Sequence, residues 1–165
     1  MENINSFIKK SGLFLATGSL LLFSFSTITQ PGQPVQANVT ITLHVDTGNI
    51  DNKNTATTCD FGQDEGISNE DFTVAVNVGD IITWEGVSSS SPSTDVVEIT
   101  KIKYVKGKNI FGKDLGPGNN RKITGKALSS TATEGDYKYD ISFTVTNNGA
   151  KRNGTFHIDP VIQVH

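Results

Sequence analysis

Hydrophobic and polar residues alternate along most of the chain beyond residue 38. A period of two places successive side chains on opposite faces of an extended strand, so this pattern predicts β-strands with one buried face. In the first run the apolar face carries Val39, Ile41, Leu43 and Val45. Further runs cover residues 72–78, 81–84, 96–105, 121–128, 137–145 and 156–164. Trp84 is the largest side chain among them, and we expect it to anchor the core.

Two irregularities refine this pattern. In residues 96–105, Val97 and Ile99 fall on one face while Ile102 and Tyr104 fall on the other. Such a change of phase predicts a β-bulge or a switch between sheets. Pro160 interrupts the last run, and because proline cannot donate a hydrogen bond, it predicts an edge or a bulge there.

Loop signals separate the runs. A serine-rich stretch covers residues 88–93 and a glycine-rich stretch covers residues 109–120, which predicts loops, and Asn147 to Gly149 predicts a tight turn. Thr, Ser, Asn and Gly are abundant, and no segment shows a convincing helical period. About seven short strands of this kind predict an all-β fold, an antiparallel two-sheet Greek-key sandwich.

The N-terminus has the pattern of an export signal. Lys9 and Lys10 precede an apolar run over residues 13–25, and Val35-Gln36-Ala37 offers small side chains at the positions that a signal peptidase reads. We expect residues 1–37 to be a cleaved signal peptide and residues 38–165 to be a single domain that is secreted, periplasmic or held at the cell surface. The alternative is an uncleaved anchor, for which the apolar run is short.

Two segments resemble the cupredoxins, the small β-sandwich electron carriers that include plastocyanin and azurin. Val76 to Trp84 resembles the strand that leads to the first copper histidine, and Gly135 to Ile141 resembles the strand that carries the copper cysteine. The resemblance implies a cupredoxin-like sandwich, and an immunoglobulin-like sandwich is the alternative.

The same comparison argues against blue copper. Ile141 stands where the resemblance implies a cysteine, no histidine occurs in residues 85–92, and no methionine follows Met1. A blue-copper site needs two histidines and a thiolate. We therefore expect no type 1 copper site and no cofactor. Cys59 is the only cysteine, which indicates either a buried thiol or an intermolecular disulfide.

Other metal chemistry stays open as an alternative. His44, His157 and His165 are the only histidines and fall on the polar faces of their predicted strands, so neighbouring terminal strands could bring them together around copper or zinc. Residues 46–85 hold nine acids and one base, Lys53, a loop charge that could bind calcium or simply favour solubility.

The following segment is basic. Residues 101–126 contain eight bases and one acid, Asp114. Such a stripe could hold an anionic polysaccharide, an acidic protein or the acidic region of another copy, although lysines on an edge strand also discourage strand pairing. The candidate partner-binding residues are Lys101, Lys103, Lys106, Lys108, Arg121 and Lys122.

These observations favour a binding module over an enzyme. The chain has no nucleophile elbow, zinc-binding helix motif or phosphate loop, and its net charge of −3 does not suggest nucleic acid. We expect an exported, non-catalytic β-sandwich that binds a surface glycan or a protein partner and does not enter the membrane after signal cleavage. A metal-binding protein and a self-assembling extracellular subunit are the alternatives.

Overall fold

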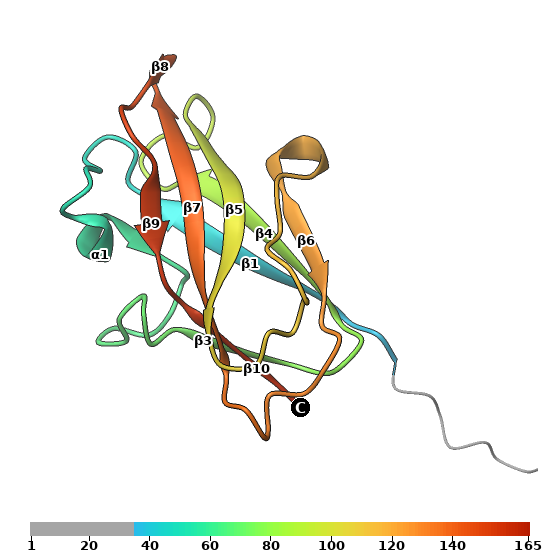
Figure 1. Ribbon diagram of the computed structural model, residues 1–165. Coiled ribbons are helices and arrows are strands. Elements are labelled where there is room, and N and C mark those ends of the chain that lie inside the picture. The colour runs from blue at the N-terminus through green and yellow to red at the C-terminus, as the bar shows by residue number, and fades with distance from the viewer. Residues whose placement is uncertain (1–34) are drawn as a thin grey trace, which may run out of the picture. The chain divides into compact units, whose positions relative to one another are not determined.

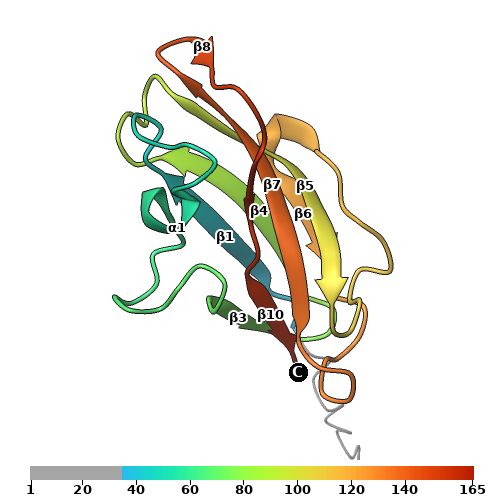
Figure 2. The same ribbon diagram turned by 60° about the vertical axis from the view of Figure 1, so that its left-hand side comes forward.

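Two β-sheets pack face to face in the computed structural model, which describes residues 35–165 (Figure 1). Sheet A has the strand order β2–β1–β4–β6, and sheet B has the order β3–β10–β7–β5, with β8 and β9 also paired to β7 (Figure 2). The strands are β1 Asn38–Val45, β2 Cys59–Asp60, β3 Thr73–Val76, β4 Ile81–Ser88, β5 Val96–Lys106, β6 Ile123–Lys126, β7 Tyr137–Asn147, β8 Ala150–Lys151, β9 Phe156–Ile158 and β10 Val161–Val164. The all-β sandwich is therefore confirmed.

Both sheets are mixed, which corrects the expectation of a purely antiparallel sandwich. β1 runs parallel to β4, and β10 runs parallel to β3, while the other strand pairs are antiparallel. A parallel pair needs a long connection, and residues 46–80 supply one between β1 and β4. Alternation of side chains reports which face is buried and carries no information about the direction of the neighbouring strand.

The predicted apolar faces form the core. Trp84 is fully buried, and its indole Nε1 donates a hydrogen bond to the hydroxyl of Tyr139 at 3.1 Å. The alternating residues of β7, from Tyr137 to Val145, are all buried, and Ile41, Leu43 and Val45 of β1 face them from the other sheet. Val78 is the exception, since it lies in the turn after β3 and is exposed.

The phase change in β5 is a bulge, the first of the two predicted alternatives. The pairing with β7 shifts by one residue between Ile99 and Lys101, so Thr100 is the extra residue. The extra residue shifts the alternation by one position, so Val97 and Ile99 before it and Ile102 after it point to the same face, and all three are buried. Pro160 likewise divides the last strand into β9 and β10, which pair with different parts of β7.

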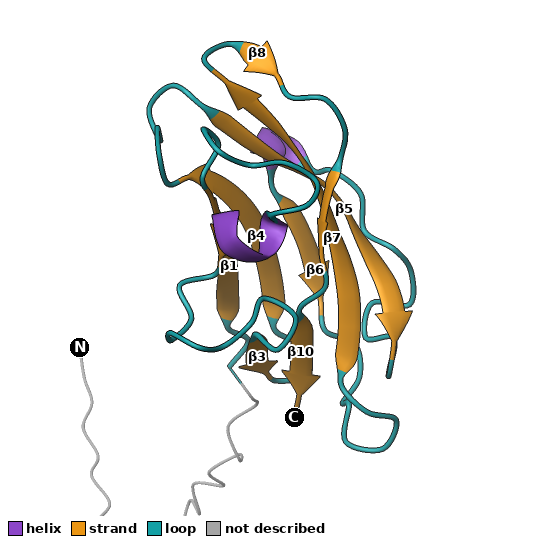
Figure 3. Cartoon of the chain, turned by 90° about the vertical axis from the view of Figure 1, so that its left-hand side faces the viewer, coloured by secondary structure: helices purple, strands orange, loops and turns teal. Residues whose placement is uncertain are grey.

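Little of the described chain is helical (Figure 3). The sequence pattern did not reveal α1 Thr55–Thr58 or the 3₁₀ turn η1 Asn119–Arg121, because four residues are too few for a helical period. The predicted turn after β7 is present, with positive φ at Asn148 and Gly149. Within residues 35–165 no helix is long and apolar enough to cross a membrane, and the predicted signal peptide lies almost entirely outside this range.

Candidate functional site

The six predicted partner-binding residues gather along one edge of the sandwich. Sheet B ends at β5 and sheet A ends at β6 on the same side of the molecule (Figure 1). β5 carries three of the six, a fourth lies just beyond its end after Gly107, and the other two immediately precede β6. We call this set the basic edge; its members are Lys101, Lys103, Lys106, Lys108, Arg121 and Lys122.

Half of the basic edge is neutralised by carboxylates. Lys101 pairs with Asp114 at 2.9 Å, Lys108 pairs with Glu134 at 2.5 Å, and Lys122 pairs with Glu85. The other three residues have no ion pair to any group in residues 35–165, and these are Lys103, Lys106 and Arg121.

Acidic residues occupy the opposite edge. β2 and β3 are the outer strands there, and the segments that lead into and join them expose Asp51, Asp60, Asp64, Glu65, Glu70 and Asp71. Two predicted members of the acidic segment lie elsewhere. Asp80 is buried and accepts hydrogen bonds from the backbone N–H groups of Ala37 and Asn77, both at 2.8 Å. Glu85 lies on β4 beside Lys122.

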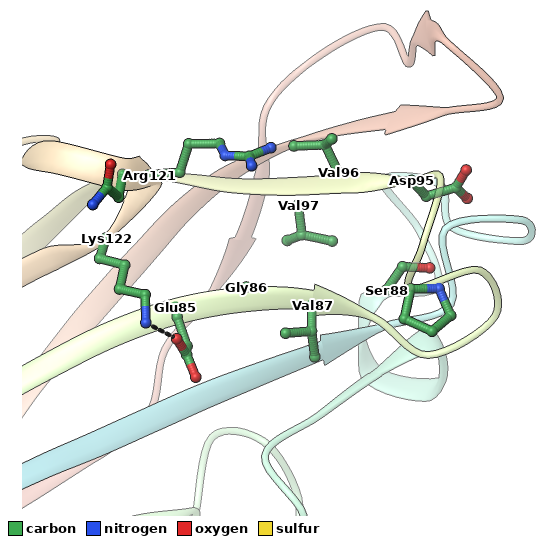
Figure 4. Close-up of a pocket in the computed structure, with 11 residues that line it drawn as sticks. Glu85, Gly86, Val87, Ser88, Asp95, Val96, Val97, Arg121 and Lys122 are labelled. Carbon is green, nitrogen blue, oxygen red and sulfur yellow. Dashed lines mark ion pairs between the residues drawn. The ribbon is translucent and has the colours of Figure 1, made fainter.

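A hollow of about 260 Å³ lies beside Arg121 and Lys122 on the basic edge (Figure 4). One wall is the second half of β4, the other is the start of β5, and η1 closes one end. We call this hollow the notch. It is lined by Glu85, Gly86, Val87, Ser88, Pro92, Asp95, Val96, Val97, Asn120, Arg121 and Lys122.

The notch exists because β6 is shorter than β4. β6 pairs with β4 only over Ile81–Trp84, with Ile123 opposite Trp84. Just before β6 the backbone is left-handed at Asn120 (φ 58°) and Arg121 (φ 61°), so the chain turns away from the ladder. Non-glycine residues rarely adopt this conformation, and two in succession store strain of a kind that is common at functional sites.

Hydrogen bonds show which backbone groups face the notch. The N–H groups of Ile81 and Ser89 point toward β1 and donate to Ala37 O, just before this strand, at 2.9 Å and to Val45 O, at its end, at 2.8 Å. Backbone groups alternate sides along a strand, so even-numbered residues of β4 point toward β6. Asp80 O accordingly accepts from Ala127 N at 3.0 Å. Beyond the end of β6, the N–H and C=O groups of Gly86 and Ser88 therefore point into the notch.

Gly86 lets the two sheets approach each other at this point. Its side-chain position faces inward, as in Ile82 and Trp84, and a Cβ atom there would lie 2.4 Å from Cγ1 of Val97. No side chain fits at that distance. The requirement for glycine thus comes from the close approach of β5.

Asp95 closes the far end of the notch and is already saturated. Its carboxylate accepts hydrogen bonds from the hydroxyl of Thr47 at 2.5 Å, the amide of Asn147 at 2.6 Å and the backbone N–H of Asn148 at 3.0 Å. These bonds, that of Thr47 first, lower the pKa of Asp95 to about 2. The carboxylate of Asp95 thus links three loops by hydrogen bonds, and few of its acceptor positions remain for a ligand.

A second hollow, of about 280 Å³, contains a polar cluster near α1. His157 Nδ1 lies 2.9 Å from Asp140 Oδ2 and 3.4 Å from Ser142 Oγ, and this hydroxyl donates to Asp140 Oδ1 at 2.7 Å. A nucleophilic triad needs the serine and the carboxylate on different ring nitrogens. Here both contact Nδ1, so the cluster lacks triad geometry. Burial, followed by the charge of Asp140, raises the pKa of nearby Asp159.

The metal-binding candidates do not converge. His44 lies on β1 in sheet A, whereas His157 lies on β9 and His165 follows β10 in sheet B. Within residues 35–165, no three His, Cys, Asp or Glu side chains are grouped closely enough to hold a metal ion. Cys59 is buried, and burial raises the pKa of its thiol to about 12.

Sequence reasoning found the basic edge and missed the notch. The only signal was Gly86, which breaks the alternation that Ile82 and Trp84 establish. Asp95 gave no signal, because it follows a serine-rich loop and its main partners lie 48 to 53 residues away.

Known proteins resemble this chain in fold alone. No protein-family model matches the chain, and no curated protein matches it. Among solved structures it is similar to an inclusion body protein, PixA, from Burkholderia cenocepacia J2315. The two share 16% sequence identity over 81% of this chain and 98% of that one, with a TM-score of 0.59.

Proposed function

We propose that this chain is an exported, non-catalytic β-sandwich module that binds an anionic partner, a surface glycan or an acidic protein, through its basic edge. One observation carries the proposal: the bases of residues 101–126 collect on the β5/β6 side, and Lys103, Lys106 and Arg121 form no ion pairs within residues 35–165. Unneutralised cations on one side attract polyanions and speed encounter with them.

The acidic residues on the opposite edge make the distribution of charge over the molecule more asymmetric. A chain with net negative charge repels polyanions over most of its surface, so binding depends on where its positive charges gather. The proposal includes removal of residues 1–37 and a final location that is secreted, periplasmic or at the cell surface.

Charge reversal on the two edges tests the proposal. Binding of dextran sulfate, as a glycan probe, and of poly-glutamate, as a protein probe, is measured against salt for the protein and for the triple variant Lys103→Glu/Lys106→Glu/Arg121→Glu. We expect this variant to lose affinity at least tenfold and to show a weaker salt dependence. The single variant Lys103→Glu is also compared with Lys53→Glu, which reverses one exposed base on the acidic side and changes the net charge by the same two units. Equal losses in these two single variants would overturn the proposal.

A second candidate function is a self-assembling extracellular subunit. The complementary charges lie on opposite edges, an arrangement that favours head-to-tail contacts, which build rings or open filaments. The similar solved structure is named an inclusion body protein, which also favours assembly. Sedimentation at rising salt tests it, since edge-to-edge association should weaken as salt screens the charges. A size that does not change with salt would contradict assembly of this kind.

The finer fold type remains part of the proposal: a Greek-key, cupredoxin-like sandwich without type 1 copper, rather than an immunoglobulin-like one. The absence of type 1 copper is supported by Ile141, which is fully buried and pairs with Ile102 and Ile158 on the neighbouring strands. Copper loading should then give no band at about 600 nm, where thiolate-to-copper charge transfer absorbs. A blue product would refute this part.

A further inference from the structure

We infer that the notch binds the C-terminal residues of a partner polypeptide, which add to β4 as a short extra strand with the terminal carboxylate beside Arg121. This inference rests on the proposed function, because it names the anionic partner that the notch end of the basic edge takes. Peptides bind many proteins by adding a strand to an exposed sheet edge, where backbone hydrogen bonds give affinity.

The first support is the open edge of β4. Gly86 and Ser88 direct their N–H and C=O groups away from β1, on the side where β6 has already ended. Within residues 35–165 no strand pairs with them on that side. The unpaired backbone groups of an open edge can hydrogen-bond to another chain. Those of Gly86 and Ser88 could pair with an added strand of about three or four residues.

The second support is the shape of the notch at its two ends. Ile123 and the preceding Lys122 occupy the line along which an added strand would continue past Glu85, with η1 beside them, and Asp95 and Pro92 lie at the other end. A polypeptide that continued past the η1 end would have to turn away from the sheet. A chain terminus does not meet this obstacle, so the closed end favours a C-terminus over an internal segment.

The third support is charge at the closed end. The guanidinium group of Arg121 has no carboxylate partner in residues 35–165, and its side chain extends along β5 toward Val96 in Figure 4. Lys122, in contrast, is held by Glu85. Arginine matches a carboxylate with two parallel N–H donors, which makes a terminal carboxylate its natural partner.

These ends also fix the direction of the added strand. Its carboxylate lies at the Glu85 end of β4 and its earlier residues lie toward Ser88, so it runs antiparallel to β4, as β6 does. Val87 and Val96 line the notch, which favours small apolar side chains in the peptide.

Peptide binding tests the inference. The probe is a fluorescein-labelled hexapeptide, Gly-Ser-Thr-Val-Thr-Val, with a free C-terminus, and fluorescence anisotropy is measured against the purified protein. We expect a dissociation constant on the order of 100 μM. Amidation of the C-terminus should weaken binding about tenfold, as expected when a hydrogen bond to a charged group is lost. Methylating successive peptide nitrogens should weaken binding at alternate positions only, because a paired strand directs every second N–H to its neighbour.

Two protein variants locate the site. Arg121→Gln should weaken the free-acid peptide about tenfold and leave the amidated peptide unchanged. Lys53→Gln, at an exposed cation on the acidic side of the molecule without an ion pair in residues 35–165, should affect neither peptide. No binding at about 1 mM, equal binding of both peptides or no alternation on methylation would each overturn the inference. If the peptides fail while dextran sulfate still binds and responds to charge reversal, the proposed function stands and only the inference falls.

Discussion

The two halves of β4 bury the same inner face and differ in what lies at their outer edge. Over Ile81–Trp84 the strand has β1 on one side and β6 on the other, and Trp84 fills the core. Over the second half β1 continues, β6 has ended, and Gly86 replaces a core side chain. One strand therefore serves as scaffold in its first half and as an open edge in its second.

This difference separates two uses of the same alternating pattern. In the first half, side chains provide the stabilising contacts and the backbone is fully paired. In the second half, the inward positions are Gly86, against Val97, and the buried polar side chain of Ser88, and unpaired backbone groups face the notch. Substitutions should therefore change stability in the first half and recognition in the second, with Gly86 as the boundary.

The largest effect should come from the scaffold half. Trp84→Ala removes a fully buried aromatic side chain and should lower the free energy of unfolding by about 3–5 kcal/mol, measured by urea denaturation. Val87→Ala, in the half that lines the notch, is the control and should cost about 1 kcal/mol or less, since this side chain is only partly buried. Equal losses would remove the distinction between the halves.

At the boundary, Gly86→Ala should destabilise the protein by about 1–3 kcal/mol, the usual range for overpacking. The new Cβ would lie 2.4 Å from Cγ1 of Val97, so the sheets must separate. Adding Val97→Ala should recover part of this loss, which a double-mutant cycle in urea measures. Gly116→Ala is the matched control, because nothing lies within 4 Å of its added Cβ. If Gly86→Ala leaves the free energy of unfolding unchanged, the close approach of the two sheets at this position does not require glycine.

The sequence alone predicted the scaffold half well and the open half poorly, for a physical reason. Burial of alternate residues leaves a trace in the sequence, so the core around Trp84 and the bulge near Thr100 could both be expected. The notch depends on where the pairing of β6 with β4 ends, which is set by the left-handed backbone at Asn120 and Arg121. Neither residue is a glycine, so the sequence does not indicate this conformation. The basic edge was predictable as charge, whereas its division into paired and unpaired cations depends on Asp114, Glu134 and Glu85, which only folding brings near.

The pH dependence of stability should distinguish the carboxylate at the notch from the one in the second hollow. The pKa of Asp95 is lowered in the folded state, to about 2, so its contribution is present above the unfolded value of about 4 and is lost as pH falls toward 2. The pKa of Asp159 is raised, so its charge opposes folding once the pH rises above the unfolded value. The free energy of unfolding is measured by urea denaturation between pH 2 and pH 6. In Asp95→Asn it should decrease less as the pH falls, whereas in Asp159→Asn it should be higher toward pH 6. Parallel pH profiles for the two variants would contradict these opposite shifts.

The smallest effect should separate two neighbouring tyrosines of the core beside Trp84. Tyr139 and Tyr137 are both fully buried and stack with ring centroids 5.3 Å apart, yet only the hydroxyl of Tyr139 has a hydrogen-bond partner. Tyr139→Phe should lower the free energy of unfolding by about 1 kcal/mol, because the indole N–H of Trp84 is left unsatisfied. Tyr137→Phe removes a buried hydroxyl that already lacks a partner, so stability should stay within about 0.5 kcal/mol or rise. If Tyr137→Phe instead proves the more costly change in urea denaturation, that hydroxyl holds an ordered water in the core, and the packing around Trp84 includes a polar contact.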